Sequence, residues 1–185
     1  MRYISIIIII IGLGFIGYSG FHLWNSKQME KEALERAESI ISNDNSDAAS
    51  FTPQFGEEIG ILELPKLKKS LPIVEGVDED DLAKGVGHYS GTALPTEKGQ
   101  IVLSGHRDTV FRRLGELEIG DELHVQMPYG KFKYSIEETE IVSADDLTVI
   151  RPDLEEEMLT VTTCYPFRYV GDAPDRYIIY AKPMN

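Results

Sequence analysis

Apolar residues follow two different patterns along the chain, and the change between them divides the molecule. Residues 4–24 contain no Asp, Glu, Lys or Arg and include an unbroken run of isoleucine at 6–11. A helix of this length crosses the roughly 30 Å hydrocarbon core of a bilayer. From residue 59 onward, apolar residues occur in short runs separated by Gly, Pro and acidic residues, a pattern typical of strands and turns. The sequence therefore predicts a membrane helix followed by a β-rich domain.

The apolar segment is either an uncleaved membrane anchor or a secretory signal peptide. Only Arg2 precedes it, and residues 20–24 contain no Ala-x-Ala cleavage pattern. Trp24 lies at its end, where aromatic rings favour the membrane interface. These features favour an uncleaved anchor. Positive charges stand on both sides of it, at Arg2 and Lys27, so charge alone does not determine its orientation.

Between the anchor and the β-rich part lies a polar connection. Residues 26–41 interleave glutamate with lysine and arginine, and their apolar residues recur at helical spacing, which predicts a helical stalk. Residues 42–50 are mostly Ser, Asn, Asp and Ala, a composition typical of a flexible linker. We therefore expect an anchor at 1–25, a stalk and linker at 26–54, and a folded domain at 55–185.

The folded domain is expected to be all-β with short helices. A helix is predicted at 78–85, where acidic residues come first and glycine last. Strands are predicted at 59–65, 69–74, 101–105, 122–127, 131–137, 140–143, 158–163 and 177–181. Many short strands separated by Gly and Pro turns predict a small β-barrel or sandwich.

Composition and charge exclude several classes of function. The formal net charge is −13, from 18 Lys and Arg against 31 Asp and Glu, which argues against nucleic-acid binding. A single cysteine excludes an intramolecular disulfide and leaves one free thiol. His88, His106, Asp108 and Cys164 show no zinc-type spacing, and the acidic runs are explained as solvated helix ends and loops. We therefore expect no metal and no cofactor.

Three residues could together perform nucleophilic catalysis. Cys164 ends a β-branched strand, His106 follows the apolar strand at 101–105, and Arg176 begins the next strand after the cysteine. A thiol attacks as its thiolate, which a neighbouring imidazole can stabilise before donating a proton to a departing amine. A guanidinium can stabilise the oxyanion that forms on the attacked carbonyl. Taken singly, however, the cysteine is more simply a buried inert thiol and the arginine a surface charge. His88, in a predicted glycine-rich loop at 85–91, could line a pocket.

Taken jointly, these residues belong to recognisable motifs. The segment Thr160-Val161-Thr162-Thr163-Cys164 is similar to the Thr-Leu-x-Thr-Cys signature of the sortase family of cell-wall transpeptidases, with valine in place of leucine. The resemblance extends from about residue 60 to 181. It includes the segments 85–89, 91–95 and 105–109. Residues 164–167 and 173–177 are similar to the class D branch of spore-forming Gram-positive bacteria.

The resemblance implies an eight-stranded β-barrel, preceded by a transmembrane helix, in which His106, Cys164 and Arg176 converge on a groove. Cys164 would attack the carbonyl after the threonine of a Leu-Pro-x-Thr sorting signal. The resulting thioester would pass to an amine of a cell-wall precursor of the lipid II type, or to a pilin lysine. The resemblance also implies a single-pass membrane protein with a cytoplasmic amino terminus and an extracellular catalytic domain.

A Leu-Pro peptide requires an apolar groove, and the sequence offers candidates for its lining. We expect the apolar side chains to be Ala93, Leu94, Val149 and Ile150. Thr163, beside the nucleophile, is a further candidate substrate-binding residue. The backbone N–H of Tyr165 could be a second oxyanion donor.

Other classes of protein were considered for the same residues. A papain-like cell-wall peptidase would place its cysteine before its histidine and at the start of a helix, the reverse of the order here. An L,D-transpeptidase would place arginine two residues after the cysteine, where this chain has Pro166. A catalytically silent, membrane-tethered peptide-binding module would keep the groove, and only an activity measurement separates it from the enzyme.

Overall fold

The computed structural model describes residues 2–43, 47–151, 153–169 and 171–184. In chain order its elements are α1 (Arg2–Asn43), η1 (Ala48–Ser50), β1 (Glu58–Leu64), η2 (Pro65–Leu67), β2 (Lys69–Glu75), α2 (Glu79–Lys84), β3 (Val86–His88), β4 (Gln100–Ser104), η3 (Leu114–Glu116), β5 (Glu122–Met127), β6 (Gly130–Ser143), β7 (Met158–Tyr165) and β8 (Asp175–Pro183).

The described residues form a closed barrel of eight strands, as the family resemblance implied, and the strands follow the order β1-β2-β3-β4-β7-β8-β6-β5. β2–β3 and β4–β7 pair in parallel, and the other neighbouring pairs are antiparallel. Because parallel strands end at the same edge, the β4–β7 pairing brings the segment after Ser104 beside the end of β7. This pairing joins parts of the chain that are far apart in sequence.

Alternation of side chains along the strands separates the core from the outer face of the barrel. Leu159 and Val161 of β7 and Ile179 and Ala181 of β8 are buried in one hydrophobic core. The intervening residues must face the opposite side, because strand side chains alternate with period two. The end of β7 therefore presents Cys164 on the outer face.

Two strand predictions were wrong. β3 lies where the sequence predicted a glycine-rich loop, and β6 is one strand where two were predicted, with a register irregularity between Ile136 and Glu138. Glycine lowers strand propensity, but at Gly87 it is required, because a Cβ there would collide with the carbonyl oxygen of Gly76. The close approach of the two backbones therefore explains why glycine occupies this strand position despite its low strand propensity.

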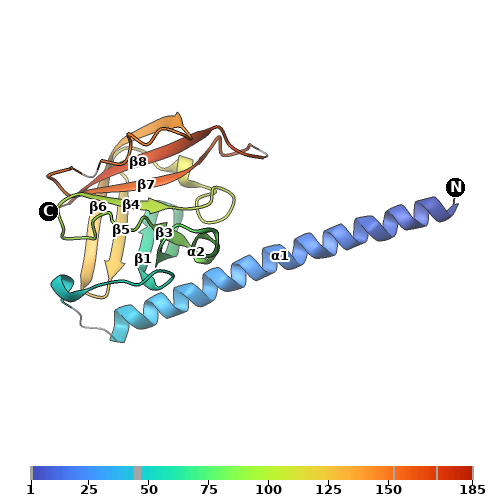
Figure 1. Ribbon diagram of the computed structural model, residues 1–185, viewed down its shortest axis with the longest axis horizontal. Coiled ribbons are helices and arrows are strands. Elements are labelled where there is room, and N and C mark those ends of the chain that lie inside the picture. The colour runs from blue at the N-terminus through green and yellow to red at the C-terminus, as the bar shows by residue number, and fades with distance from the viewer. Residues whose placement is uncertain (1, 44–46, 152, 170, 185) are drawn as a thin grey trace.

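Helix α1 is one continuous helix of 42 residues that covers both the predicted anchor and the predicted stalk. Figure 1 shows its N-terminal half projecting beyond the barrel and its C-terminal half lying along it. Ala33 and Ala37 are fully buried there, and Arg36 pairs with Glu58 of β1 at 2.8 Å. Part of the helix, within Ile6–Ser42, is long and apolar enough to cross a membrane.

The domain boundaries at 25 and 54 remain predictions. The helix passes through the first boundary without interruption. Of the predicted flexible linker at 42–50, residues 44–46 lie outside the described residues, and residues 48–50 form the short helix η1. The first strand of the barrel begins at Glu58.

Candidate active site

Cys164 and Arg176 are directly opposite each other on neighbouring antiparallel strands, β7 and β8. Residues paired in this way have their Cβ atoms about 4.5–5.5 Å apart and project from the same face of the sheet. The thiol is half-buried and belongs to the only cysteine in the chain. The strand register, rather than a loop, therefore sets the relation between these two residues.

His106 reaches the same site from the loop after β4. The Gly105 N–H donates to the carbonyl oxygen of Thr162 at 3.2 Å, and the Thr163 hydroxyl donates to the Gly105 carbonyl at 2.7 Å. These two bonds extend the β4–β7 connection by one residue beyond the ladder. They hold the His106 backbone against β7, and its side chain is exposed.

Glycine at position 105 is required by close packing. A Cβ there would lie 2.6 Å from a ring carbon of Phe111, closer than non-bonded carbons approach. Phe111 is fully buried and is fixed by the core around it. A larger residue at 105 would therefore push the His106 loop away from β7.

A cavity of about 350 Å³ lies on the outer face of β4, β7 and β8. His106, Cys164 and Arg176 all line it. Its floor comes from residues of these three strands, and its walls come from the α2 region and the loop between β6 and β7. The apolar lining residues include Leu82, Val102, Leu147, Val149, Ile150 and Ile178. The cavity is thus a largely apolar groove that leads to the thiol.

The structure brings most of the predicted site residues together. Besides His106, Cys164 and Arg176, the cavity is lined by Val149, Ile150 and Thr163. Thr163 is buried, and its hydroxyl is already bonded to Gly105, so it holds the His106 loop.

Three predicted substrate-binding residues do not line this cavity within the described chain. Ala93 and Leu94 are partly buried and pack against the barrel core. The Tyr165 ring lies 5.7 Å from Phe167 and 6.4 Å from Tyr177, between ring centroids. Tyr165 follows Cys164 along the strand and therefore faces the opposite side. The use of its backbone N–H as an oxyanion donor remains a prediction.

Arg176 is held by backbone oxygens. One terminal nitrogen, Nη1, donates to the carbonyls of Asp175 at 3.0 Å and Ala173 at 3.3 Å. Among the described residues, no carboxylate forms an ion pair with this guanidinium. Its charge and its other N–H groups are therefore free to meet an oxyanion in the cavity.

Gln100 supports the groove, although the sequence did not single it out. Its side chain is buried, with 3% of its surface exposed. Its amide nitrogen donates to the Val149 carbonyl and to the Thr160 hydroxyl, both at 2.8 Å, and its amide oxygen accepts from the Arg151 N–H at 2.6 Å. Gln100 thereby fixes the wall formed by residues 149 and 150. The sequence signal for Gln100 is a polar residue at the start of an otherwise apolar strand.

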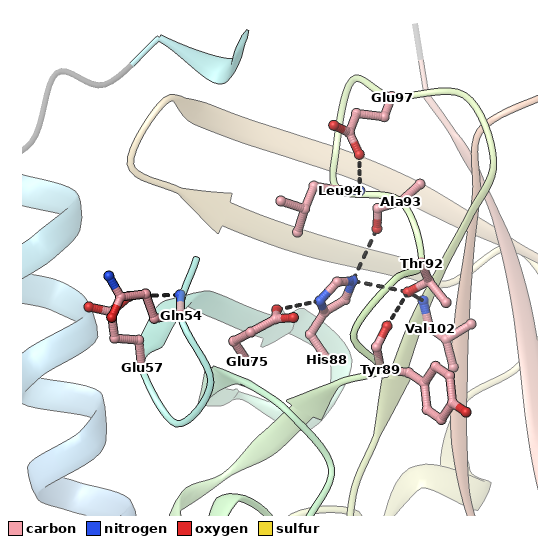
Figure 2. Close-up of polar contacts among 10 residues, drawn as sticks. All are labelled: Gln54, Glu57, Glu75, His88, Tyr89, Thr92, Ala93, Leu94, Glu97 and Val102. Carbon is pink, nitrogen blue, oxygen red and sulfur yellow. Dashed lines mark hydrogen bonds and ion pairs between the residues drawn. The ribbon is translucent and has the colours of Figure 1, made fainter. Parts of the chain in front are cut away.

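His88 has a structural role. Its imidazole is 2% exposed and does not line the cavity. Figure 2 shows Nδ1 directed at Glu75 Oε2, at 2.6 Å, and Nε2 directed at the Ala93 carbonyl and the Thr92 hydroxyl, at 3.1 and 3.0 Å. Because a carbonyl can only accept, the contact with Ala93 requires a proton on Nε2. His88 thus ties the loop after β3 to the end of β2.

The Glu75 carboxyl is the acidic partner of this pair. Burial by itself raises the pKa of Glu75, but the hydrogen bond from His88, with smaller contributions from Ser90 and from the charge of His88, together leave the pKa below its usual value. Among the described residues, no three His, Cys, Asp or Glu side chains are grouped as metal ligands would be.

A second cavity, of about 730 Å³, lies between α1 and the barrel. It shares His106 and Leu82 with the first cavity. Its other lining residues include Leu23 of α1 and Arg112 of the loop after β4. The histidine therefore stands where the two cavities meet.

A closed barrel that carries a cysteine, an arginine and a histidine on one outer groove is the arrangement of a thiol-dependent enzyme. A family model, the Sortase domain, matches residues 62–184. The chain belongs to the sortase family, whose members are cysteine transpeptidases.

Relatives agree with this assignment along the whole chain. Sortase D from Bacillus subtilis (strain 168) is 50% identical over 196 aligned residues, which cover 100% of this chain and 99% of that protein. This likeness indicates a class D sortase.

Solved structures give the same result. A Clostridium perfringens Sortase D5 transpeptidase matches with a TM-score of 0.73 and 29% identity, covering 85% of this chain and 99% of that one. The catalytic domain of B. anthracis SrtD matches with a TM-score of 0.61 and 45% identity, covering 75% and 95%.

Proposed function

We propose that this protein is a membrane-anchored class D sortase that cleaves a Leu-Pro-x-Thr sorting signal after threonine and transfers the new carboxyl end to an amine. The observation that carries the proposal is the direct pairing of Cys164 with Arg176, on a groove that His106 also lines. A thiol, an imidazole and an unpaired guanidinium on one cavity supply the groups that acyl transfer requires.

The donor peptide lies in the cavity above β4, β7 and β8. Val149 and Ile150 line its wall, with Ile178 on its floor, and these apolar side chains suit the leucine and proline of the signal. The threonine carbonyl then stands at Cys164, where the strand ends and the groove opens.

The reaction has two halves that share one thioester. In the first, the Cys164 thiolate attacks the threonine carbonyl carbon, the amide C–N bond breaks, and His106 donates a proton to the leaving amine. In the second, His106 removes a proton from the acceptor amine as it attacks the thioester, and the thiolate of Cys164 leaves. Arg176 stabilises the oxyanion in both halves.

The acceptor is an amine on a cell-wall precursor of the lipid II type or on a pilin lysine. Helix α1 holds the domain at the membrane, with the amino terminus in the cytoplasm and the barrel outside the cell. Surface proteins that carry the sorting signal are the other partners.

The decisive experiment detects the thioester and the transfer separately. Full-length protein is incubated with a Leu-Pro-x-Thr-x peptide, with and without a primary amine, and analysed by mass spectrometry. An acyl adduct on Cys164 and an amine-linked peptide are expected, and both should disappear in Cys164→Ala. Arg113→Ala, which removes an exposed arginine paired with Glu116, serves as the control for Arg176→Ala. Unchanged transfer in both Cys164→Ala and Arg176→Ala would exclude this function, and no transfer by wild type would favour a silent binding module.

A further inference from the structure

Arg107 is a buried cation directly after the histidine of the site. Only 6% of its surface is exposed. Its Nη1 donates to the carbonyl oxygen of Pro166 at 3.0 Å, and Pro166 follows Cys164 by two residues. The guanidinium therefore joins the segment that carries His106 to the segment that follows the nucleophile.

The other side of this guanidinium is held by Asp108. Arg107 Nε donates to Oδ1 at 3.2 Å and Nη2 donates to Oδ2 at 3.0 Å. The Asp108 side chain is 69% exposed, so the carboxylate keeps most of its hydration while the arginine is buried. The hydrogen bond from Arg107 is the main reason that the pKa of Asp108 lies below its usual value. The two hydrogen bonds to Asp108 thus fix the guanidinium of Arg107 in one orientation.

This contact lies just beyond the end of the β4–β7 ladder. The paired register ends at Ser104 and Thr162, and two further hydrogen bonds join Gly105 to Thr162 and Thr163. The next connection between the two segments is made by the Arg107 side chain. Burying a charged group is unfavourable unless it is paired and hydrogen-bonded, and here each of the three guanidinium nitrogens donates to an oxygen.

We propose that Arg107 is a positioning residue of this sortase: it sets the separation between His106 and Cys164, and its charge favours the thiolate of Cys164. The inference rests on the proposed function only in taking Cys164 as the nucleophile. The hydrogen bond to Asp108 is the main reason that the pKa of Arg107 lies above its usual value, and a smaller electrostatic contribution comes from Cys164. A cation near a thiol favours its ionised form.

Other groups also act on the thiol, and the test must separate them. His106, Arg176, Asp146 and Tyr89 line the cavity with Cys164. Asp146 already accepts hydrogen bonds from the hydroxyl and the N–H of Thr148. Changes at Arg107 and Asp108 remove none of these four side chains.

The test measures how the rate of Cys164 alkylation by iodoacetamide depends on pH, in full-length protein in detergent. Since the chain has one cysteine, alkylation reports on this thiol alone. In Arg107→Gln the midpoint should move to higher pH by on the order of one unit. In Asp108→Asn, which removes a negative charge and keeps the guanidinium, it should move to lower pH. Opposite shifts are not expected from a general loss of stability.

Turnover with a Leu-Pro-x-Thr-x peptide and an amine separates position from charge. Arg107→Lys keeps the charge but loses the forked guanidinium. Because the charge remains, the alkylation midpoint should stay near that of wild type. Because the fork is lost, kcat should fall by about 10- to 100-fold with little change in KM. Arg113→Gln is the matched control, because this exposed arginine makes the same two-bond contact with a nearby carboxylate, Glu116. It should change neither property.

Two results would overturn the inference. One is an alkylation midpoint that equals the wild-type value in both Arg107→Gln and Asp108→Asn. If Arg107→Gln does not fold, an unchanged midpoint in Asp108→Asn is sufficient to overturn the inference. The other is a kcat of Arg107→Lys that equals the wild-type value when both are expressed per titrated active site. If the alkylation shifts occur but wild type transfers no peptide, the proposed function fails while the effect of Arg107 on the thiol stands.

Discussion

The Gln100 side chain and the Val149 carbonyl are joined by a 2.8 Å hydrogen bond, although the two residues are 49 positions apart in the chain. Gln100 begins β4, and Val149 belongs to the loop that forms a wall of the catalytic groove. The floor and the wall of the groove are therefore connected through one buried amide.

Replacing Gln100 with leucine should loosen that wall. The change leaves the Arg151 N–H and the Val149 carbonyl without their partner, at a cost of about 1–3 kcal/mol in the free energy of unfolding. KM for the sorting peptide should rise more than kcat falls, because the wall contacts the peptide rather than the reacting atoms. Urea unfolding and steady-state kinetics measure both. Gln54→Leu, at an exposed glutamine, should change neither, and an unchanged KM in Gln100→Leu would contradict the role given to this residue.

The Glu75–His88 pair should make stability depend on pH. The folded-state pKa of Glu75 is lowered, so its contribution is present above the unfolded-state value of about 4.3 and is lost as pH falls through the folded-state pKa. Glu75→Gln should therefore lower the free energy of unfolding by on the order of 1–2 kcal/mol at pH 7, and the difference from wild type should shrink below pH 4. Urea titrations at pH 7 and pH 3.5 test this.

The exposed Glu79 provides the comparison for that experiment. Glu79→Gln should give the same small difference from wild type at both pH values. A Glu75→Gln difference that stays constant from pH 7 to pH 3.5 would mean that the carboxylate charge contributes nothing.

Removing the Arg176 guanidinium should affect the chemical step. We expect Arg176→Ala to lower kcat by about 10²- to 10³-fold, the usual cost of losing one oxyanion donor, with a smaller change in KM. Alkylation of Cys164 should persist, since the thiol itself remains. Single-turnover formation of the acyl-enzyme is the appropriate measurement. A defect confined to KM would instead assign Arg176 to peptide binding.

Adding a methyl group at Gly105 should displace His106. In Gly105→Ala the new Cβ would overlap the Phe111 ring, and overpacking of this kind costs about 1–3 kcal/mol. Both thermal stability and kcat should fall. The second change Phe111→Leu makes room for the methyl group, so the double variant should regain part of the lost kcat. If Phe111→Leu restores stability but no activity, the position of the His106 loop does not depend on this contact.

Local patterns in the sequence predicted most of the fold because they depend on neighbouring residues. The β-branched run at 158–163 predicted a strand, and the structure confirms it as part of β7. Strand β3 was missed because its three residues, one of them a glycine, carry little local signal, and the close approach of the Gly76 backbone explains the glycine at 87. The long strand β6 was divided because its irregularity near Glu138 interrupts the pattern.

The sequence alone determined the long apolar helix at the amino terminus, the β-rich domain and the identity of the three catalytic candidates, because hydrophobic runs and motifs are properties of consecutive residues. Only the tertiary structure decided which residues surround them. Ala93, Leu94 and Tyr165 lie outside the groove, whereas Gln100 and Arg107 support it through bonds to distant segments. Such contacts depend on the parallel pairing of β4 with β7 and the closure of the barrel, and no local pattern encodes which residues they bring together.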